Sequence, residues 1–360
     1  MNNKIKLFFV ITVISLGFLF YFVSNYNYIN LGFVKNEIQE TQIFENNLNK
    51  LIKINSIDDI EKKKYELTDF IWKSGYRSDK IPDLIIEDFN DLRYNNLENL
   101  EKIQKFEVNM INGVNSIVYH FIPKNPNNKL IIYIQGHDGD FFNGIETIET
   151  LINKGYSVAA FSMPLTGMNN QPVVETDFGK MQILSHKYFE LLDDSKFSSM
   201  LYFFEPINVV INYLEKEFHY TQFHAIGISG GGWTVTVYST LDERISKIFS
   251  VAGSVPFYMR SSDKNIGDYE QINSEFYRIA NYLELYTIAS IGPSKNLIQI
   301  FNKYDPCCFS GENFNYEDLI KEKISQINSG GNFKIYLDEN TRKHEISKWS
   351  MNKILEELDD

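Results

Sequence analysis

The residues that most clearly suggest chemistry are those of GISGGG, Gly227 to Gly232. They follow a strand-like apolar run, 222–228, and precede a helix-like run, 233–241. A glycine inside a helix costs about 1 kcal/mol relative to alanine, so the run of glycines needs another reason. The pattern G-x-S-x-G between a strand and a helix holds a serine at the tip of a sharp turn. It predicts that Ser229 is a nucleophile, and the alternative is an ordinary tight turn.

The same turn would also stabilise negative charge. Gly227 and Gly231 relieve steric contacts between the turn and the adjacent strands. The helix that follows points unpaired N–H groups at the serine, and the N–H of Gly230 is placed to donate to an oxyanion. A serine beside such donors indicates acyl transfer or hydrolysis.

Elements that could position this turn begin at about residue 104, where short apolar runs alternate with helical segments. Asn112-Gly113 predicts a hairpin between 106–111 and 116–122. The alternation predicts an α/β fold with a doubly wound, mainly parallel sheet and the hairpin at one edge. The further expected strands are 129–136, 156–163, 222–228, 247–254, 297–305 and 333–339, and the expected helices are 145–154, 206–218, 233–241 and 316–327.

Two segments, 166–200 and 256–293, do not fit the alternation. Both leave from the carboxyl ends of expected strands, where open α/β sheets bind their ligands. We expect them to be helical inserts that form a lid or the walls of a pocket. Charged residues are frequent in 175–200, which disfavours the broad apolar lid of a lipase.

On the G-x-S-x-G turn and its place between strand and helix, the chain resembles the α/β-hydrolase superfamily over roughly residues 104–360. That family orders its catalytic triad as serine, then acid, then histidine. The resemblance implies His344 as the base, because it is the only histidine after Ser229 and follows the last expected strand. It implies Asp305 as the acid, because Asp305 ends the preceding strand.

Alternatives to these assignments remain open at this point. Asp268 or Glu270 would serve as the acid if the acid loop had moved one strand back. His344 would be a surface histidine if its charged neighbours Lys343 and Glu345 mark an exposed loop.

The resemblance also implies a second oxyanion donor in the loop after the strand 129–134. In the family this loop usually begins His-Gly, and here it begins Gln135-Gly136. Since the donor is a backbone N–H, we expect it at Gly136 or His137. The His137 side chain is either a wall of the pocket or hydrogen-bonded within the turn. The triad needs no cofactor and no metal, and the sequence has no H-E-x-x-H or similar cluster.

Residues 1–30 form a separate segment. Leu7 to Val23 contains no charge and follows Lys4 and Lys6, which predicts a transmembrane helix with the rest of the chain outside. The next residues, SNYNYIN, lack a small-x-small cleavage pattern, so we expect a retained signal anchor rather than a cleaved signal peptide or a buried core helix. The catalytic domain would then be membrane-anchored on the extracytoplasmic side, or secreted if the segment is cleaved.

The stretch 31–103, the net charge and the two cysteines give further expectations about the domains and partners. Residues 31–103 look helical in pieces, as a stalk or an N-terminal layer below the catalytic domain, 104–360. The net charge of −12 excludes nucleic acid as an expected partner. Cys307 and Cys308 are adjacent and form no disulfide framework; they are either two small buried side chains or a vicinal disulfide.

These observations together predict a serine hydrolase. The favoured activity is that of a carboxylesterase on a small-molecule or glycan ester, with removal of acetyl groups from a glycan as one possibility. A small serine peptidase or an acyltransferase would use the same residues. The alternative outside enzymes is a catalytically dead, membrane-tethered binding module.

Overall fold

The computed structural model describes residues 48–260 and 265–359, which belong to two compact units, Met1–Leu51 and Ile52–Asp360. In the first unit the described part is a 3-10 helix, Leu48–Leu51. The expected membrane segment in residues 1–30 lies outside the described residues, so it stays a prediction. Within 48–260 and 265–359, every helix is too short or too polar to cross a bilayer.

The second unit is organised by a nine-stranded sheet with the order β1-β2-β3-β5-β4-β8-β9-β10-β11. Neighbours from β5 to β11 pair in parallel, while β1, β2 and β3 add antiparallel strands at one edge. This confirms the predicted doubly wound, mainly parallel sheet and its edge hairpin. The strands are β1 (Leu84–Ile86), β2 (Leu100–Asn109), β3 (Asn115–Pro123), β4 (Lys129–Ile134), β5 (Ser157–Phe161), β8 (Gln222–Ile228), β9 (Ile245–Val251), β10 (Asn296–Asn302) and β11 (Asn332–Asp338).

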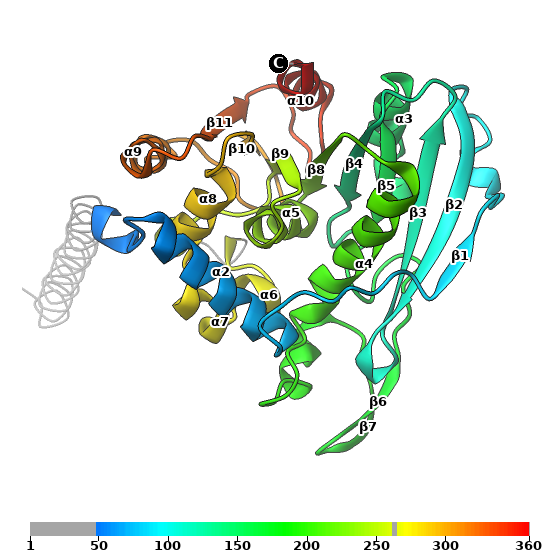
Figure 1. The fold of residues 1–360 in the computed structure, drawn as a ribbon, viewed down its shortest axis with the longest axis horizontal. Helices are drawn as coiled ribbons and strands as arrows, with labels where there is room; N and C mark the ends of the chain where they lie inside the picture. The colour runs from blue at the N-terminus through cyan, green and yellow to red at the C-terminus, as the bar shows by residue number, and fades with distance from the viewer. Residues whose placement is uncertain (1–47, 261–264, 360) are drawn as a thin grey trace, which may run out of the picture. The chain divides into compact units, whose positions relative to one another are not determined.

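Helices cover both faces of the sheet (Figure 1). On one face, α3 and α10 bury a stripe of aliphatic side chains against β4, β5, β8, β9 and β10. On the other face, α5 packs on β8 and β9, with α4 and α8 beside it. The helices are α2 (Ile57–Trp72), α3 (Ile145–Asn153), α4 (Leu201–Phe218), α5 (Gly230–Leu241), α6 (Tyr269–Ile272), α7 (Ser274–Ile279), α8 (Tyr282–Ser290), α9 (Glu317–Ile327) and α10 (Lys348–Asp359).

Among its described residues, the expected helical layer, 31–103, is α-helical only over α2, with short 3-10 helices at Leu48–Leu51 and Leu92–Tyr94. The hydroxyl of Ser56 caps α2 by accepting from the N–H of Asp59. The apolar side of α2 packs on α5 and α7. Downstream, β1 pairs with β2, and β2 starts before residue 104, so the expected boundary at 104 falls inside the sheet. The boundary was placed too late because β1 has only three residues and a half-exposed face, so its sequence shows no clear alternation of apolar and polar residues.

A buried ion pair ties this layer to the sheet's helices. Arg77 contacts the carboxylate of Asp242, which directly follows α5 and also binds Arg244 at 2.7 Å. Burial alone would raise the pKa of Asp242, but the hydrogen bonds and charges of the two arginines outweigh it and lower that pKa to about 2. The carboxylate therefore stays charged where the chain after α2 crosses α5.

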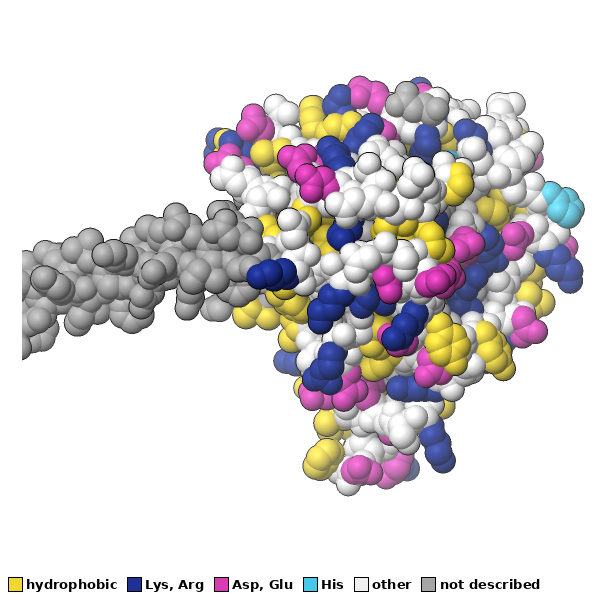
Figure 2. Space-filling view, turned by 60° about the vertical axis from the view of Figure 1, so that its left-hand side comes forward, with side chains coloured by type: hydrophobic (Ala, Val, Ile, Leu, Met, Phe, Trp, Pro, Cys, Tyr) yellow, Lys and Arg dark blue, Asp and Glu magenta, His cyan; other side chains and the backbone are white. Residues whose placement is uncertain are grey.

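The two inserts differ from each other. The segment 256–293 is helical, as expected, over α6, α7 and α8. The segment 166–200 is not: it forms a two-stranded hairpin, β6 (Val173–Thr176) and β7 (Gly179–Gln182), then a 3-10 helix, His186–Leu191. The turn itself is residues 177 and 178, and Gly179, which starts β7, has a φ of +96° that suits a hairpin and would break a helix. This hairpin forms the lowest part of the view in Figure 1, and hydrophobic and charged side chains cover the same region in Figure 2.

Candidate active site

The strand–turn–helix around Ser229 is present, and its backbone is strained. Ser229 has φ 56° and ψ −126°, a backbone conformation that residues other than glycine rarely adopt. A Cβ added to Gly227 would lie 2.2 Å from the carbonyl oxygen of Gly231, and one added to Gly231 would lie 2.1 Å from that of Ile134. Only glycine fits at both positions, which confirms that Gly227 and Gly231 relieve steric contacts between the turn and its neighbours.

The sheet register brings three loops to the same edge. Ile228, the last residue of β8, is level with Val251 of β9, which is level with Ile300 of β10. Asn302 of β10 is in turn level with Asp338 of β11. Because these strands are parallel, the loops that carry Ser229, Asp305 and His344 all leave from their carboxyl ends.

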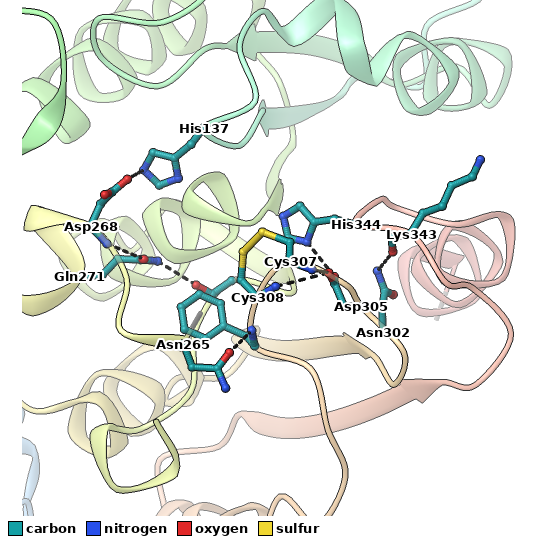
Figure 3. The surroundings of a disulfide bond; sticks show 12 residues. His137, Asn265, Asp268, Gln271, Asn302, Asp305, Cys307, Cys308, Lys343 and His344 are labelled. Carbon is teal, nitrogen blue, oxygen red and sulfur yellow. Dashed lines mark hydrogen bonds and ion pairs between the residues drawn. A yellow bond between two sulfur atoms is a disulfide. The ribbon is translucent and has the colours of Figure 1, made fainter. Parts of the chain in front are cut away.

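Asp305 and His344 meet in a hydrogen bond. Nδ1 of His344 lies 2.7 Å from Oδ2 of Asp305, whose side chain is fully buried (Figure 3). The other oxygen, Oδ1, accepts the N–H of Cys307 at 2.8 Å, which fixes the carboxylate. In the described part of the chain, Nε2 of His344 is buried and has no hydrogen-bond partner. The imidazole is therefore oriented by an acid on one side and is available on the other.

Cys307 and Cys308 are joined by a disulfide directly after the acid (Figure 3). Cys307 is exposed and Cys308 is half-buried, so the interpretation as two small buried side chains is wrong and the vicinal disulfide is confirmed. Both sulfur atoms lie within 4.8 Å of a ring nitrogen of His344. The disulfide is thus part of the wall around that imidazole.

The loop after β4 contacts the candidate nucleophile. A Cβ on Gly136 would lie 2.8 Å from Cβ of Ser229 and 3.4 Å from its Oγ, so the backbone there approaches as closely as only glycine permits. Gln135, which stands where the family usually has histidine, braces the loop. Its Nε2 donates to Oδ1 of Asp138 at 2.9 Å, and its Oε1 accepts from the hydroxyl of Tyr133.

Asp268 and Glu270, the alternative acids, contact a different histidine. Nε2 of His137 lies 2.9 Å from Oε1 of Glu270 and 3.2 Å from Oδ2 of Asp268. The second oxygen of Glu270 lies 3.1 Å from Nδ1 of His186. The structure therefore brings these carboxylates to the loop after β4 and leaves Asp305 with His344.

The side chain of His137 joins this cluster to the helix that follows Ser229. A Cβ on Gly230 would lie 2.3 Å from Cε1 of His137, so the imidazole packs against the first residue of α5. Burial lowers the pKa of His137, but the charges of Glu270 and Asp268 outweigh it and raise that pKa. For Glu270 the two effects are reversed. Burial alone would raise its pKa, but the charges of His186 and His137 outweigh burial and hold that pKa well below its usual range.

A cleft of about 620 Å³ opens beside the loop after β4. It lies between that loop, residues 165–171 and the end of the β6–β7 hairpin. The His137 side chain is therefore a wall of this cleft, and its hydrogen bonds reach α6 rather than closing within its own turn. The polar residues that line the cleft include His137, Asp138, Thr166, Asn169, Gln171 and Gln182.

His186 is the residue that sequence reasoning missed. It lies in the charged stretch 175–200, and the structure buries it and pairs it with Glu270. Its partner is 84 residues away in the sequence, and neither residue belongs to a spaced motif, so no local signal could have found the pair.

The solved structures with a similar fold include esterases. Acetyl xylan esterase 1 from a Thermoanaerobacterium species superposes with a TM-score of 0.56 at 12% identity, over 86% of this chain and 96% of that one. An acetyl xylan esterase from a Paenibacillus species gives 0.55 at 12% identity, over 87% and 98%. A methylesterase gives 0.54 at 13% identity, over 88% and 67%. Neither a protein-family model nor a curated protein sequence matches this chain. At these identities the likeness establishes the fold.

Proposed function

This chain has the fold of the α/β-hydrolase superfamily, and on that premise we propose that it is a serine hydrolase of carboxylic esters. The hydrogen bond between Asp305 and His344 is the observation that carries the proposal. It joins two residues 39 positions apart in the order that the resemblance requires, and it leaves Nε2 of the imidazole buried without a partner in the described residues.

The proposed reaction follows from these positions. Oγ of Ser229 attacks the acyl carbon while Nε2 of His344 takes its proton, and Asp305 stabilises the imidazolium. The N–H of Gly230 and that of Gly136 or His137 hold the charge on the former carbonyl oxygen. The imidazolium then protonates the leaving alcohol, and water, activated by the same imidazole, releases the acid from Ser229.

The proposed substrate class is a polar ester, with an acetylated glycan favoured. The cleft beside the loop after β4 is lined largely by polar side chains, among them Asn169, Gln171 and Gln182, which suit hydroxyl-rich substrates. Two of the structures that share this fold are acetyl xylan esterases by name. Both observations favour a sugar ester over a lipid ester.

We expect a fluorophosphonate probe to label the full-length protein in mild detergent, and mass spectrometry to place the label on Ser229. An activated serine reacts because its neighbouring imidazole removes the proton. The same preparation should release acetate from p-nitrophenyl acetate and from acetylated xylan. Label on another residue, or a folded protein that takes no label, would contradict the assignment and leave a binding module as the explanation.

The location proposed for the catalytic domain is the extracytoplasmic side of a membrane, held by residues 1–30. Lys4 and Lys6 before the uncharged run Leu7–Val23 support it. Fractionation should leave the full-length protein with membranes at high salt, because an apolar helix is not released by screening charge. A mature chain that starts near residue 25 would replace the anchor with a signal peptide and make the protein secreted.

A further inference from the structure

A second cluster of ligating side chains lies beside the candidate active site. His137 comes from the loop after β4, His186 from the 3-10 helix of the 166–200 insert, and Asp268 and Glu270 from the start of α6. One donor atom from each lies within 4.8 Å of all the others. Figure 3 shows His137 pointing at Asp268, away from the disulfide and His344. The cluster is therefore built from three segments that the chain separates widely.

The orientation of His186 leaves a lone pair that points into the cluster. Its Nε2 lies 2.8 Å from the carbonyl oxygen of Pro164, which can only accept, so Nε2 carries the hydrogen. In the neutral imidazole Nδ1 is then unprotonated, and it lies 3.1 Å from a carboxylate oxygen of Glu270. An imidazole nitrogen and a carboxylate oxygen at that distance are joined either by a proton on Nδ1 or by a metal ion that both atoms bind. A ligating histidine whose other N–H donates to a backbone carbonyl is also the usual arrangement in metal sites.

The charge of the cluster supports the same conclusion. The side chain of Glu270 is fully buried, and within residues 48–260 and 265–359 its ion-pair partners are the two histidines. A buried carboxylate needs a compensating charge, because desolvation costs several kcal/mol. Glu270 and Asp268 bring two carboxylates to the two imidazoles, a donor set whose two negative charges one divalent cation would neutralise.

The distances match those of ligands that share one ion. Zn–N and Zn–O bonds of roughly 2.0–2.2 Å in a tetrahedron place neighbouring donor atoms about 3.3 Å apart. Nε2 of His137 lies 2.9 Å from Oε1 of Glu270 and 3.2 Å from Oδ2 of Asp268, and Nδ1 of His186 lies 3.1 Å from the other oxygen of Glu270, Oε2. We propose that His137, His186, Asp268 and Glu270 bind one divalent transition-metal ion, with Zn²⁺ as the best fit to two imidazoles and two carboxylates.

The role of this ion is to hold loops rather than to react. It would tie the 166–200 insert and α6 to the loop after β4, which lies against Ser229. Asp268, with 54% of its side chain exposed, provides the entry from solvent, while His186 and Glu270 are closed off. The site is independent of the proposed function, because the Ser229 chemistry needs no metal and metal binding needs no active serine.

The first test is zinc binding by the wild-type full-length protein in detergent without reductant. We expect metal analysis after incubation with ZnCl₂ and removal of excess to find about one zinc per chain. The melting temperature should rise by about 5 °C with Zn²⁺ and fall back with a chelator, since a ligand that binds only the folded state stabilises it. Ca²⁺ and Mg²⁺ should give no shift, because imidazole ligands do not suit them. A protein that takes up no zinc and shows no shift would overturn the proposal and leave an imidazolium–carboxylate cluster.

The second test assigns the ion to these residues. His186→Gln and Glu270→Gln should each lose the bound zinc and the melting shift, while His219→Asn, at the exposed end of α4, should keep both. A variant with Cys307→Ser and Cys308→Ser should also keep the zinc, which separates this site from the neighbouring sulfur atoms and His344. Zinc retained in a folded His186→Gln or Glu270→Gln protein, or lost in the cysteine variant, would overturn the assignment. If those substitutions prevent folding, zinc uptake by the wild-type protein still decides whether the chain binds the ion.

Discussion

Replacing Ser229 with alanine should reduce the hydrolysis of p-nitrophenyl acetate by about 10⁴-fold or more. The substitution removes Oγ, which forms the acyl-enzyme, and leaves the oxyanion donors able to supply only residual catalysis. The strained backbone should be unaffected, because alanine has the same Cβ at φ 56° as serine. We therefore expect kcat to collapse while the melting curve stays within about 1 °C of wild type.

The matched control is Ser239→Ala. Ser239 is a buried serine on α5, and its hydroxyl donates to the carbonyl of Thr236 within the helix. It lies outside the candidate site, so its loss should leave turnover of the ester unchanged. Activity retained by the Ser229→Ala protein would exclude Ser229 as the nucleophile, whatever the control shows.

Replacing His344 with alanine should be nearly as severe, with a loss of about 10³-fold or more in kcat/KM. The variant lacks the imidazole that takes the proton of Ser229 in the proposed reaction, and the carboxylate of Asp305 is left buried without its imidazole partner. Asp305→Asn should also lose most activity, because an amide would favour the wrong imidazole tautomer. Steady-state kinetics of both variants, with circular dichroism to confirm folding, measure these effects.

His219→Asn is the control for a histidine outside the site. His219 ends α4 in the left-handed conformation, which asparagine also tolerates, so activity and folding should be preserved. A His344→Ala enzyme within about tenfold of wild type would place the base elsewhere, since general-base catalysis contributes at least 10²-fold. His137, the other imidazole near Ser229, would then be the residue to examine.

Local patterns in the sequence predicted the elements that depend on near neighbours. The hairpin at Asn112-Gly113 follows from two residues that adopt positive φ, 61° and 71°. The elbow at Ser229 follows from glycines whose missing Cβ atoms allow a close approach of backbone to backbone. Runs of apolar residues likewise predicted the strands β2 to β5 and β8 to β11 of the main sheet, since central strands such as β4 and β8 are nearly continuous apolar runs.

The sequence was less informative where local signals are weak. The edge strand β1 has three residues and a half-exposed face, so its place in the sheet comes from pairing with β2. The hairpin of the 166–200 insert depends on one turn before Gly179, in a segment whose charged residues fit a helix equally well. The sequence left open whether Cys307 and Cys308 are buried thiols or a disulfide. The structure joins them in a disulfide on a loop where neither side chain is fully buried.

By itself, then, the sequence determined the elements of the α/β sheet and the strained turn at Ser229, because each depends on residues a few positions apart. The order of the triad candidates along the chain came from the family resemblance. Only the tertiary structure decided that Asp305 contacts His344 and that Asp268 and Glu270 contact His137 and His186 instead. Those contacts join loops 39 to 133 residues apart. They are set by strand order and register, which bring distant carboxyl ends to one edge of the sheet.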